Sequence, residues 1–152
     1  MLRDTIADSL TEAQKSQNKR RVATLRLINA AILDRDIALR GKGKDRADDE
    51  EVIDILAKMV KQREESSRLY LEGGRNDLAT QETEEIEIIR EFLPSQLSEE
   101  EINEAVAGAI SQAGAQSLRD MGKVMAILKE RYRGQMDMGK AGAMIKKQLN
   151  SQ

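Results

Sequence analysis

Basic residues gather in the last third of the chain, where their spacing suits the binding of a nucleic-acid backbone. Gly122 and Lys123 stand at the start of a predicted helix, where backbone N–H groups and the helix dipole attract a phosphate and glycine permits close approach. With Tyr132 as the only nearby aromatic residue, we expect salt-dependent contact with phosphates and RNA shape rather than base stacking. Taken singly, each cation also fits an ordinary solvated surface. The candidate RNA-binding residues are Gly122, Lys123, Lys129, Arg131, Arg133 and Lys140.

The composition removes most catalytic chemistry. The sequence contains no cysteine and no histidine, so it has no thiolate nucleophile, no Ser-His-Asp triad and no histidine-based metal site. The glycines and lysines of residues 41–44 lack the spacing of a phosphate-binding P-loop. The acids of residues 82–87 have the ligand type for Mg²⁺, but acids along a helix more often form a solvated face. We therefore assign no catalytic residue, no metal ligand and no cofactor, and expect no enzyme activity from the chain by itself.

The same composition indicates a helical protein. Aromatic residues make up 2% of the 152 residues, so the core must consist of Leu, Ile, Val, Met and Ala, a set rich in good helix formers. No apolar run approaches the roughly 20 residues that span a bilayer, and the first residues lack the apolar stretch of a signal peptide. We expect an all-α, cytoplasmic protein without membrane association.

The net charge of −2 conceals three zones. Residues 1–48 and 102–152 each carry a net charge of +4, and residues 49–101 carry −10. This pattern argues against a protein that coats nucleic acid over its whole surface, but it permits local binding of RNA at either end. On charge alone, solvated helix faces are the simpler interpretation.

Apolar residues at helical spacing divide the first part of the chain into four helices, which end before Pro94. The proline is expected to stop the fourth helix because it pushes the preceding residue out of the helical region. We take it as the boundary between an N-terminal helical subdomain, residues 1–94, and a C-terminal three-helix bundle, residues 95–152. The four predicted helices cover residues 1–15, 19–39, 50–72 and 77–93.

The predicted helix over residues 50–72 carries polar residues on its inward side. Arg63 and Ser67 fall on the extension of its apolar line, so each needs a partner in the interior. We expect an acid of the next helix, Glu82 or Glu85, to provide it, which makes this a stabilising polar network. The expected buried positions are Val52, Leu56, Met59 or Val60, and Leu71.

Capping signals precede several of the predicted helices. Ser16 or Asn18 is expected to cap the second helix, and Asp48 or Asp49 the third. Ser98–Glu101 has the pattern of a capping box. The three predicted C-terminal helices run from residue 99 to near Gly114, from Met121 to Gly134, and over residues 138–149.

Arg131, Arg133 and Lys140 lie on either side of the predicted turn at Gly134. A turn between two antiparallel helices brings the end of one helix close to the start of the next. These three cations are therefore expected to converge on one stretch of RNA backbone. Asp137 is expected to cap the last helix.

Three segments carry a resemblance to a known family. They are Lys61–Ser66 with Gly74–Leu78, then Glu91–Ser98, then Asp120–Met125. The Leu-Pro-Ser-Gln-Leu string in the second segment and the Asp-Met-Gly-Lys-Val-Met string in the third are fairly specific. Their order and spacing resemble the YqeY-like proteins, also called the GatB/YqeY family, over essentially the whole chain. The chain departs from the family at Gln135–Gly139, where an Asp-Gly turn is expected.

The resemblance implies an all-helical protein of two parts. The second part is similar to the tail of the GatB subunit of the glutamine-dependent Asp/Glu-tRNA amidotransferase, which helps to hold tRNA while amide formation occurs in other domains. The family label is carbon–nitrogen ligase with glutamine as amido-N-donor, a label inherited from that larger enzyme.

Two hypotheses of function follow. The first is a non-catalytic, tRNA-associated accessory module, with tRNA or a protein of the tRNA amidation or translation machinery as partner. The alternative is a helical protein-interaction adaptor without RNA binding, using the acidic middle region or the face of Arg20 and Arg26. A glutamine-dependent amidotransferase component is a third, weaker reading, because the chain offers neither a phosphate cradle nor a nucleophile.

Overall fold

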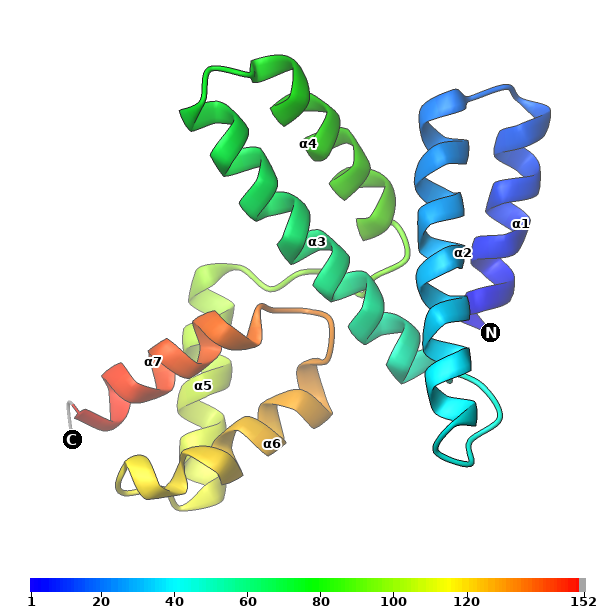
Figure 1. Cartoon of the computed structure of the whole chain (residues 1–152). Coiled ribbons are helices and arrows are strands. Elements are labelled where there is room, and N and C mark those ends of the chain that lie inside the picture. Colours follow the sequence, from blue (N-terminus) through cyan, green and yellow to red (C-terminus); the bar gives the residue numbers. More distant parts are fainter. Residues whose placement is uncertain (151–152) are drawn as a thin grey trace. The chain divides into compact units, whose positions relative to one another are not determined.

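The computed structural model describes residues 1–150 and divides the chain into two compact units. We call them the N-unit (Met1–Leu93) and the C-unit (Pro94–Gln152). Every regular element within residues 1–150 is helical, which confirms the all-α class (Figure 1). The N-unit contains α1 (Leu2–Lys15), α2 (Lys19–Arg40), α3 (Asp49–Glu72) and α4 (Asn76–Arg90). The C-unit contains α5 (Glu99–Ala113), a 3₁₀ turn η1 (Leu118–Asp120), α6 (Met121–Tyr132) and α7 (Met138–Asn150).

The N-unit consists of two helical hairpins, α1–α2 and α3–α4, with α2 also packed against α4 (Figure 1). Each chain reversal is set by local chemistry: the Asn18 side chain caps α2 by accepting from the backbone N–H of Arg21, and Asp48 caps α3 by accepting from that of Glu51. Gly74, at a φ of +76°, lies in the turn between α3 and α4. Of the alternative caps, Asn18 and Asp48 are thus confirmed.

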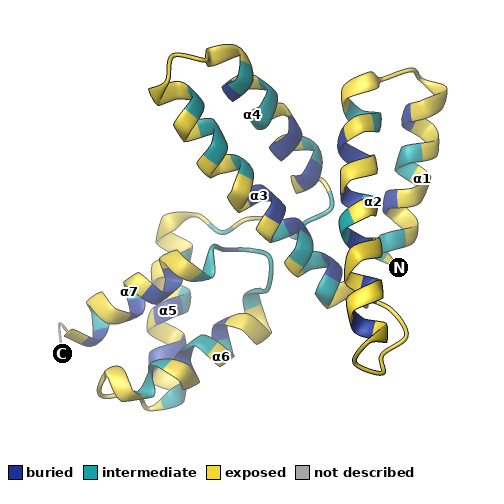
Figure 2. Ribbon diagram, in the orientation of Figure 1, coloured by how far each residue is buried: buried dark blue, intermediate teal, exposed yellow. Residues whose placement is uncertain are grey.

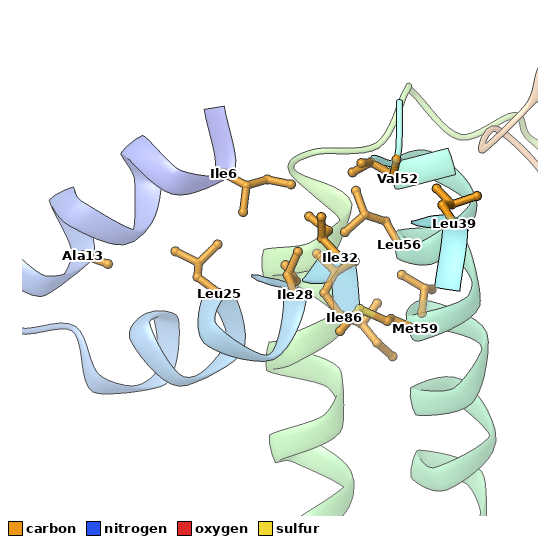
Figure 3. Close-up of a cluster of buried hydrophobic side chains, with 13 residues drawn as sticks. Ile6, Ala13, Leu25, Ile28, Ile32, Leu39, Val52, Leu56, Met59 and Ile86 are labelled. Carbon is orange, nitrogen blue, oxygen red and sulfur yellow. The ribbon is translucent and has the colours of Figure 1, made fainter. Parts of the chain in front are cut away.

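The core of the N-unit is aliphatic (Figure 3). Its centre consists of side chains from all four helices, and the exposed positions face outward on each of them (Figure 2). Because no aromatic side chain is fully buried in this core, stability depends on many small apolar contacts. The fully buried members include Ile6, Leu25, Ile28, Leu39, Val52, Leu56 and Ile89.

Two expectations for the N-unit are wrong. Leu71 was expected to be buried, but 57% of it is exposed, because the apolar side of α3 ends at Val60. The fourth helix was expected to reach residue 93, whereas α4 ends at Arg90. Past that point the amides of Phe92 and Leu93 bond to carbonyls three residues back, so the chain tightens before Pro94.

The C-unit is a bundle of three helices around a second aliphatic core. The capping box of Ser98 and Glu101 begins α5, which confirms the prediction, and Gly114 ends that helix in the left-handed region at a φ of +64°. Gly142 is buried, and a Cβ there would lie 3.3 Å from the Cε of Met121, so a small residue at this point lets α6 and α7 pack closely.

Candidate nucleic-acid interface

The structure places three predicted cations around the turn that joins α6 to α7. Arg131 lies in the last turn of α6, Arg133 directly follows that helix, and Lys140 lies in the first turn of α7. Gly134 reverses the chain between them at a φ of +77°, a backbone conformation that favours glycine. These three cations therefore flank one turn, as their spacing in the sequence indicated.

Polar contacts fix the backbone of this turn. The Gln96 side-chain amide donates to the Gly134 carbonyl at 2.6 Å, and the Leu97 amide donates to the Gln135 carbonyl at 2.9 Å. The Asp137 carboxylate accepts from the amide of Gly139 at 2.8 Å and so begins α7. The Leu-Pro-Ser-Gln-Leu string thus has a structural role: it holds the α6–α7 turn.

The turn at Gln135–Gly139, where the chain departs from the family pattern, is well formed. Met136 is buried in the core of the C-unit, and Asp137 still serves as the cap of α7. An apolar side chain in the turn therefore adds to the core instead of disturbing it.

The cations on α6 do not share one face. At about 100° per residue, Lys129 and Arg131 point roughly 160° apart around the helix, and Lys123 lies roughly 120° from Lys129. Val124 and Leu128 occupy the buried side between them. A single RNA backbone on one side of the bundle therefore contacts some of the predicted residues and not all six.

At least one backbone N–H group at the start of α6 already has a hydrogen-bond partner within the protein. The 3₁₀ turn runs directly into the helix, and the Met121 amide bonds to the Leu118 carbonyl. Asp120 accepts from the amides of Gln116 and Ser117, and these bonds, with the charge of Lys123, lower the pKa of the Asp120 carboxyl.

No contact within residues 1–150 requires glycine at position 122. Gly122 is exposed, and a Cβ built there meets no atom within 4 Å. Lys123 beside it is exposed as well. Phosphate binding by Gly122 and Lys123 remains a prediction, since the helix end offers fewer free N–H groups than the sequence suggested.

Four of the predicted cations are not held in ion pairs. Each side chain is exposed and makes no ion pair or hydrogen bond within residues 1–150. Arg133 differs, because it is half-buried and has an interaction inside the protein. The four are Lys123, Lys129, Arg131 and Lys140.

Charged residues in the N-unit have a structural role. The Arg63 guanidinium lies 2.9 Å from the buried Glu85 carboxylate, which confirms the expected partnership, and Ser67 donates to the Ala79 carbonyl at 3.5 Å. Burial, together with the charge of Glu85, raises the pKa of Glu82. Within the described chain, no group of acids is arranged to hold a metal ion.

A second polar network in the N-unit was not predicted. Asp36 is buried on the core side of α2, where it accepts from Arg3 at 2.5 Å and from the amide of Ala47 at 2.7 Å. It thereby joins α1, α2 and the α2–α3 connection. The available signal was the position of Asp36, one helical turn after Ile32 on the apolar side of α2.

The structure thus defines a class: within residues 1–150 it is an all-helical protein of two compact units. The model of the Yqey-like protein family matches residues 3–149, and the chain belongs to that family. Within residues 1–150, no helix has both the length and the apolar character needed to cross a membrane.

Relatives occur in yeasts under the name "Altered inheritance of mitochondria protein 41, mitochondrial". The Saccharomyces cerevisiae protein is 30% identical over 84 residues, 55% of this chain and 44% of the relative. The Lachancea thermotolerans protein is 30% identical over 115 residues, 72% and 59% respectively. The Candida glabrata protein is 29% identical over 89 residues, 59% and 48%. The chain spans about half the length of the curated relatives it matches.

Proposed function

We propose that this protein is a non-catalytic accessory module that binds tRNA through the C-unit. The observation that supports it most directly is the set of exposed cations Lys123, Lys129, Arg131 and Lys140, which make no ion pair within residues 1–150. Solvated, unpaired cations gain from releasing the counterions of a phosphate backbone, whereas cations in ion pairs must first give up a partner.

The surface favours contact with folded RNA over contact with bases. Tyr132 is half-buried, and no other aromatic residue lies in the C-unit, so stacking platforms are absent from its described residues. The proposed place of action is the cytoplasm; the yeast relatives carry "mitochondrial" in their names. The inherited carbon–nitrogen ligase label is not part of the proposal.

The test is tRNA binding by the full chain at low salt, measured by fluorescence anisotropy. The wild type is compared with a triple variant, Lys123→Glu, Arg131→Glu and Lys140→Glu, whose side chains are exposed. We expect micromolar binding by the wild type and at least a tenfold loss in the variant. The slope of log affinity against log salt should also become shallower by about 2 to 3, because three phosphate contacts are lost.

A matched control separates this surface from general charge. Lys42→Glu, Arg46→Glu and Lys58→Glu change the net charge of the chain equally, at exposed positions of the N-unit without ion pairs within residues 1–150. The proposal requires this control to bind nearly as well as the wild type. Equal losses in both variants would reject the proposed surface, and no binding by the wild type would favour the adaptor hypothesis.

The contacts of Arg20 and Arg26 bear on the adaptor hypothesis, in which these two arginines would form one face for a partner protein. Arg20, which was expected to meet a partner protein, lies 3.2 Å from Glu84 and 4.0 Å from Glu85. Arg26 is exposed and makes no ion pair within residues 1–150. The two arginines therefore do not form one free basic face.

A further inference from the structure

The helix α2 has apolar residues on two opposite sides. One side lies in the core of the N-unit with Leu25, Ile28 and Ile32 (Figure 3). The other side faces solvent, and Ile37 and Leu33 there are 64% and 59% exposed. A helix that is apolar on both sides is typical of a helix that is covered on both sides. The exposed face, which we call the outer face of α2, consists of Ala23, Arg26, Leu27, Ala30, Leu33, Asp34 and Ile37.

The outer face is symmetric about its middle residue, Ala30. At about 100° per residue, all seven side chains lie within roughly 60° of the direction of Ala30. Residues equally far before and after Ala30 form matched pairs in sequence. Leu27 matches Leu33, Ala23 matches Ile37, and Arg26 matches Asp34.

We propose that the outer face of α2 binds a second copy of this chain, with the two α2 helices antiparallel and the twofold axis at Ala30. In such a pair each residue lies level with the residue equally far from Ala30 in the other copy. Arg26 of each copy is then level with Asp34 of the other, and the small Ala23 is level with the larger Ile37. The same sequence thus supplies both halves of the contact.

The charges of this face support a second copy over an unrelated partner. Arg26 and Asp34 are exposed, and neither side chain has an ion pair or hydrogen bond within residues 1–150. They carry opposite charge at matched positions, which favours the antiparallel pair, since a parallel pair would set like charges at the same level. The like-charged residues Arg20 and Arg40 lie at the edges, and Arg20 is already held by Glu84.

The size of the face sets the expected strength. Residues 23–37 span about 21 Å of helix. One helix face in each copy gives an interface at the low end of specific protein contacts. The small Ala30 at the centre permits the helix axes to approach closely. We expect a dimer with a dissociation constant in the range of tens to hundreds of micromolar.

Sedimentation velocity of the full chain from about 10 to 500 µM tests the proposal. The wild type should shift from monomer to dimer over this range. Arg26→Asp and Asp34→Arg, as single variants, each place like charges level with one another and should weaken the dimer at least tenfold. The double variant exchanges the two charges and should restore the dimer, which only an antiparallel contact between copies predicts.

A control and two adverse outcomes complete the test. Leu69→Asp changes an exposed leucine of α3 and should leave the dimer unchanged. All changed positions are exposed, so circular dichroism should show an intact fold. A monomer at every concentration would overturn the proposal, and so would a dimer that is insensitive to either single charge reversal or is not restored by the exchange.

Discussion

The two units use the same kind of residue for different purposes. In the N-unit most arginines lie against a carboxylate, as Arg3 does with Asp36 and Arg63 with Glu85. In the C-unit, cations such as Lys123 and Arg131 face solvent without an ion pair within residues 1–150. The difference lies in the surroundings rather than in the residue type: a cation paired with a carboxylate stabilises the fold, and one without such a pair is available to a ligand.

The ion pairs of the N-unit differ in how much they stabilise the fold. Arg68 with Glu65 and Arg75 with Asp77 are exposed pairs within one hairpin, and such pairs add little to stability. Asp36 is 4% exposed, and its pair with Arg3 joins α2 to α1 through residues that are 33 apart in sequence. The contrast between the two units therefore depends on the few buried ion pairs of the N-unit. Loss of one partner in such a pair leaves the other charge without solvation.

The largest expected change in stability follows from breaking the buried pair of Asp36 and Arg3. Asp36→Asn removes the negative charge that holds Arg3 and weakens the bond to the Ala47 amide, so we expect a loss of about 3 kcal/mol in the free energy of unfolding of the N-unit. Urea titration followed by amide NMR signals reports each unit separately. Signals of the C-unit should change much less.

Asp8→Asn is the matched control for this prediction. Asp8 is an exposed residue of α1 without a partner within residues 1–150, so its substitution should change stability by less than about 0.5 kcal/mol. Equal effects of the two substitutions would show that pairing in the N-unit does not support its fold.

The stability of the N-unit should also depend on pH through the Asp36 carboxyl, and this effect is smaller than that of the substitution. The hydrogen bond from Arg3, the bond from the Ala47 amide and the charges of Arg3 and Arg40 hold the pKa of Asp36 below its usual value, despite its burial. A lowered pKa means that the ionised carboxylate stabilises the fold above its unfolded pKa of about 3.9. That contribution is lost as the pH falls through the folded pKa.

The stability difference between wild type and Asp36→Asn should therefore be constant from pH 7 to about 5 and shrink below about 4. Measuring a difference between variants cancels groups such as Glu82, whose pKa is raised and which acts in the opposite sense. Urea titrations at several pH values give this difference. A difference that stays constant down to pH 2 would contradict the role of the Asp36 charge.

The helices were predictable because their signals are local. Asn18, Asp48 and Ser98 cap the helices that the sequence indicated, and Gly114 ends α5 as expected. Leu71 was misplaced because periodicity shows which residues share a face but not how far along a helix the partner extends. Tertiary contact decides that, and a single sequence does not report it.

The candidate site was predictable only in part. Arg131, Arg133 and Lys140 flank one turn because short connections force neighbouring helix ends together. The exposure of a cation and the absence of an ion pair depend on carboxylates elsewhere in the fold, which spacing does not reveal. The contact between Gln96 and the Gly134 carbonyl joins residues 38 apart in sequence, and it gives no local signal.

The smallest expected change in stability follows from removing the contact between Gln96 and the Gly134 carbonyl. Gln96→Ala removes hydrogen bonds to the carbonyls of Gly134 and Pro94 at an exposed site, so we expect a loss of about 0.5–1 kcal/mol in the stability of the C-unit. The backbone turn that carries Arg131 and Lys140 should also become less fixed. Binding of tRNA by full-length protein should weaken two- to threefold, although no charge is changed.

Gln112→Ala is the matched control, because Gln112 is exposed on α5 and its side chain makes no hydrogen bond within residues 1–150. If both substitutions leave tRNA binding unchanged, the turn needs no support from Gln96, and the free cations act only by their charge. If Gln96→Ala alone weakens binding, the geometry of the turn contributes as well. The C-unit would then differ from the N-unit in a further way: its polar contacts hold a turn in place, and the nearby cations Arg131 and Lys140 make no ion pair within residues 1–150.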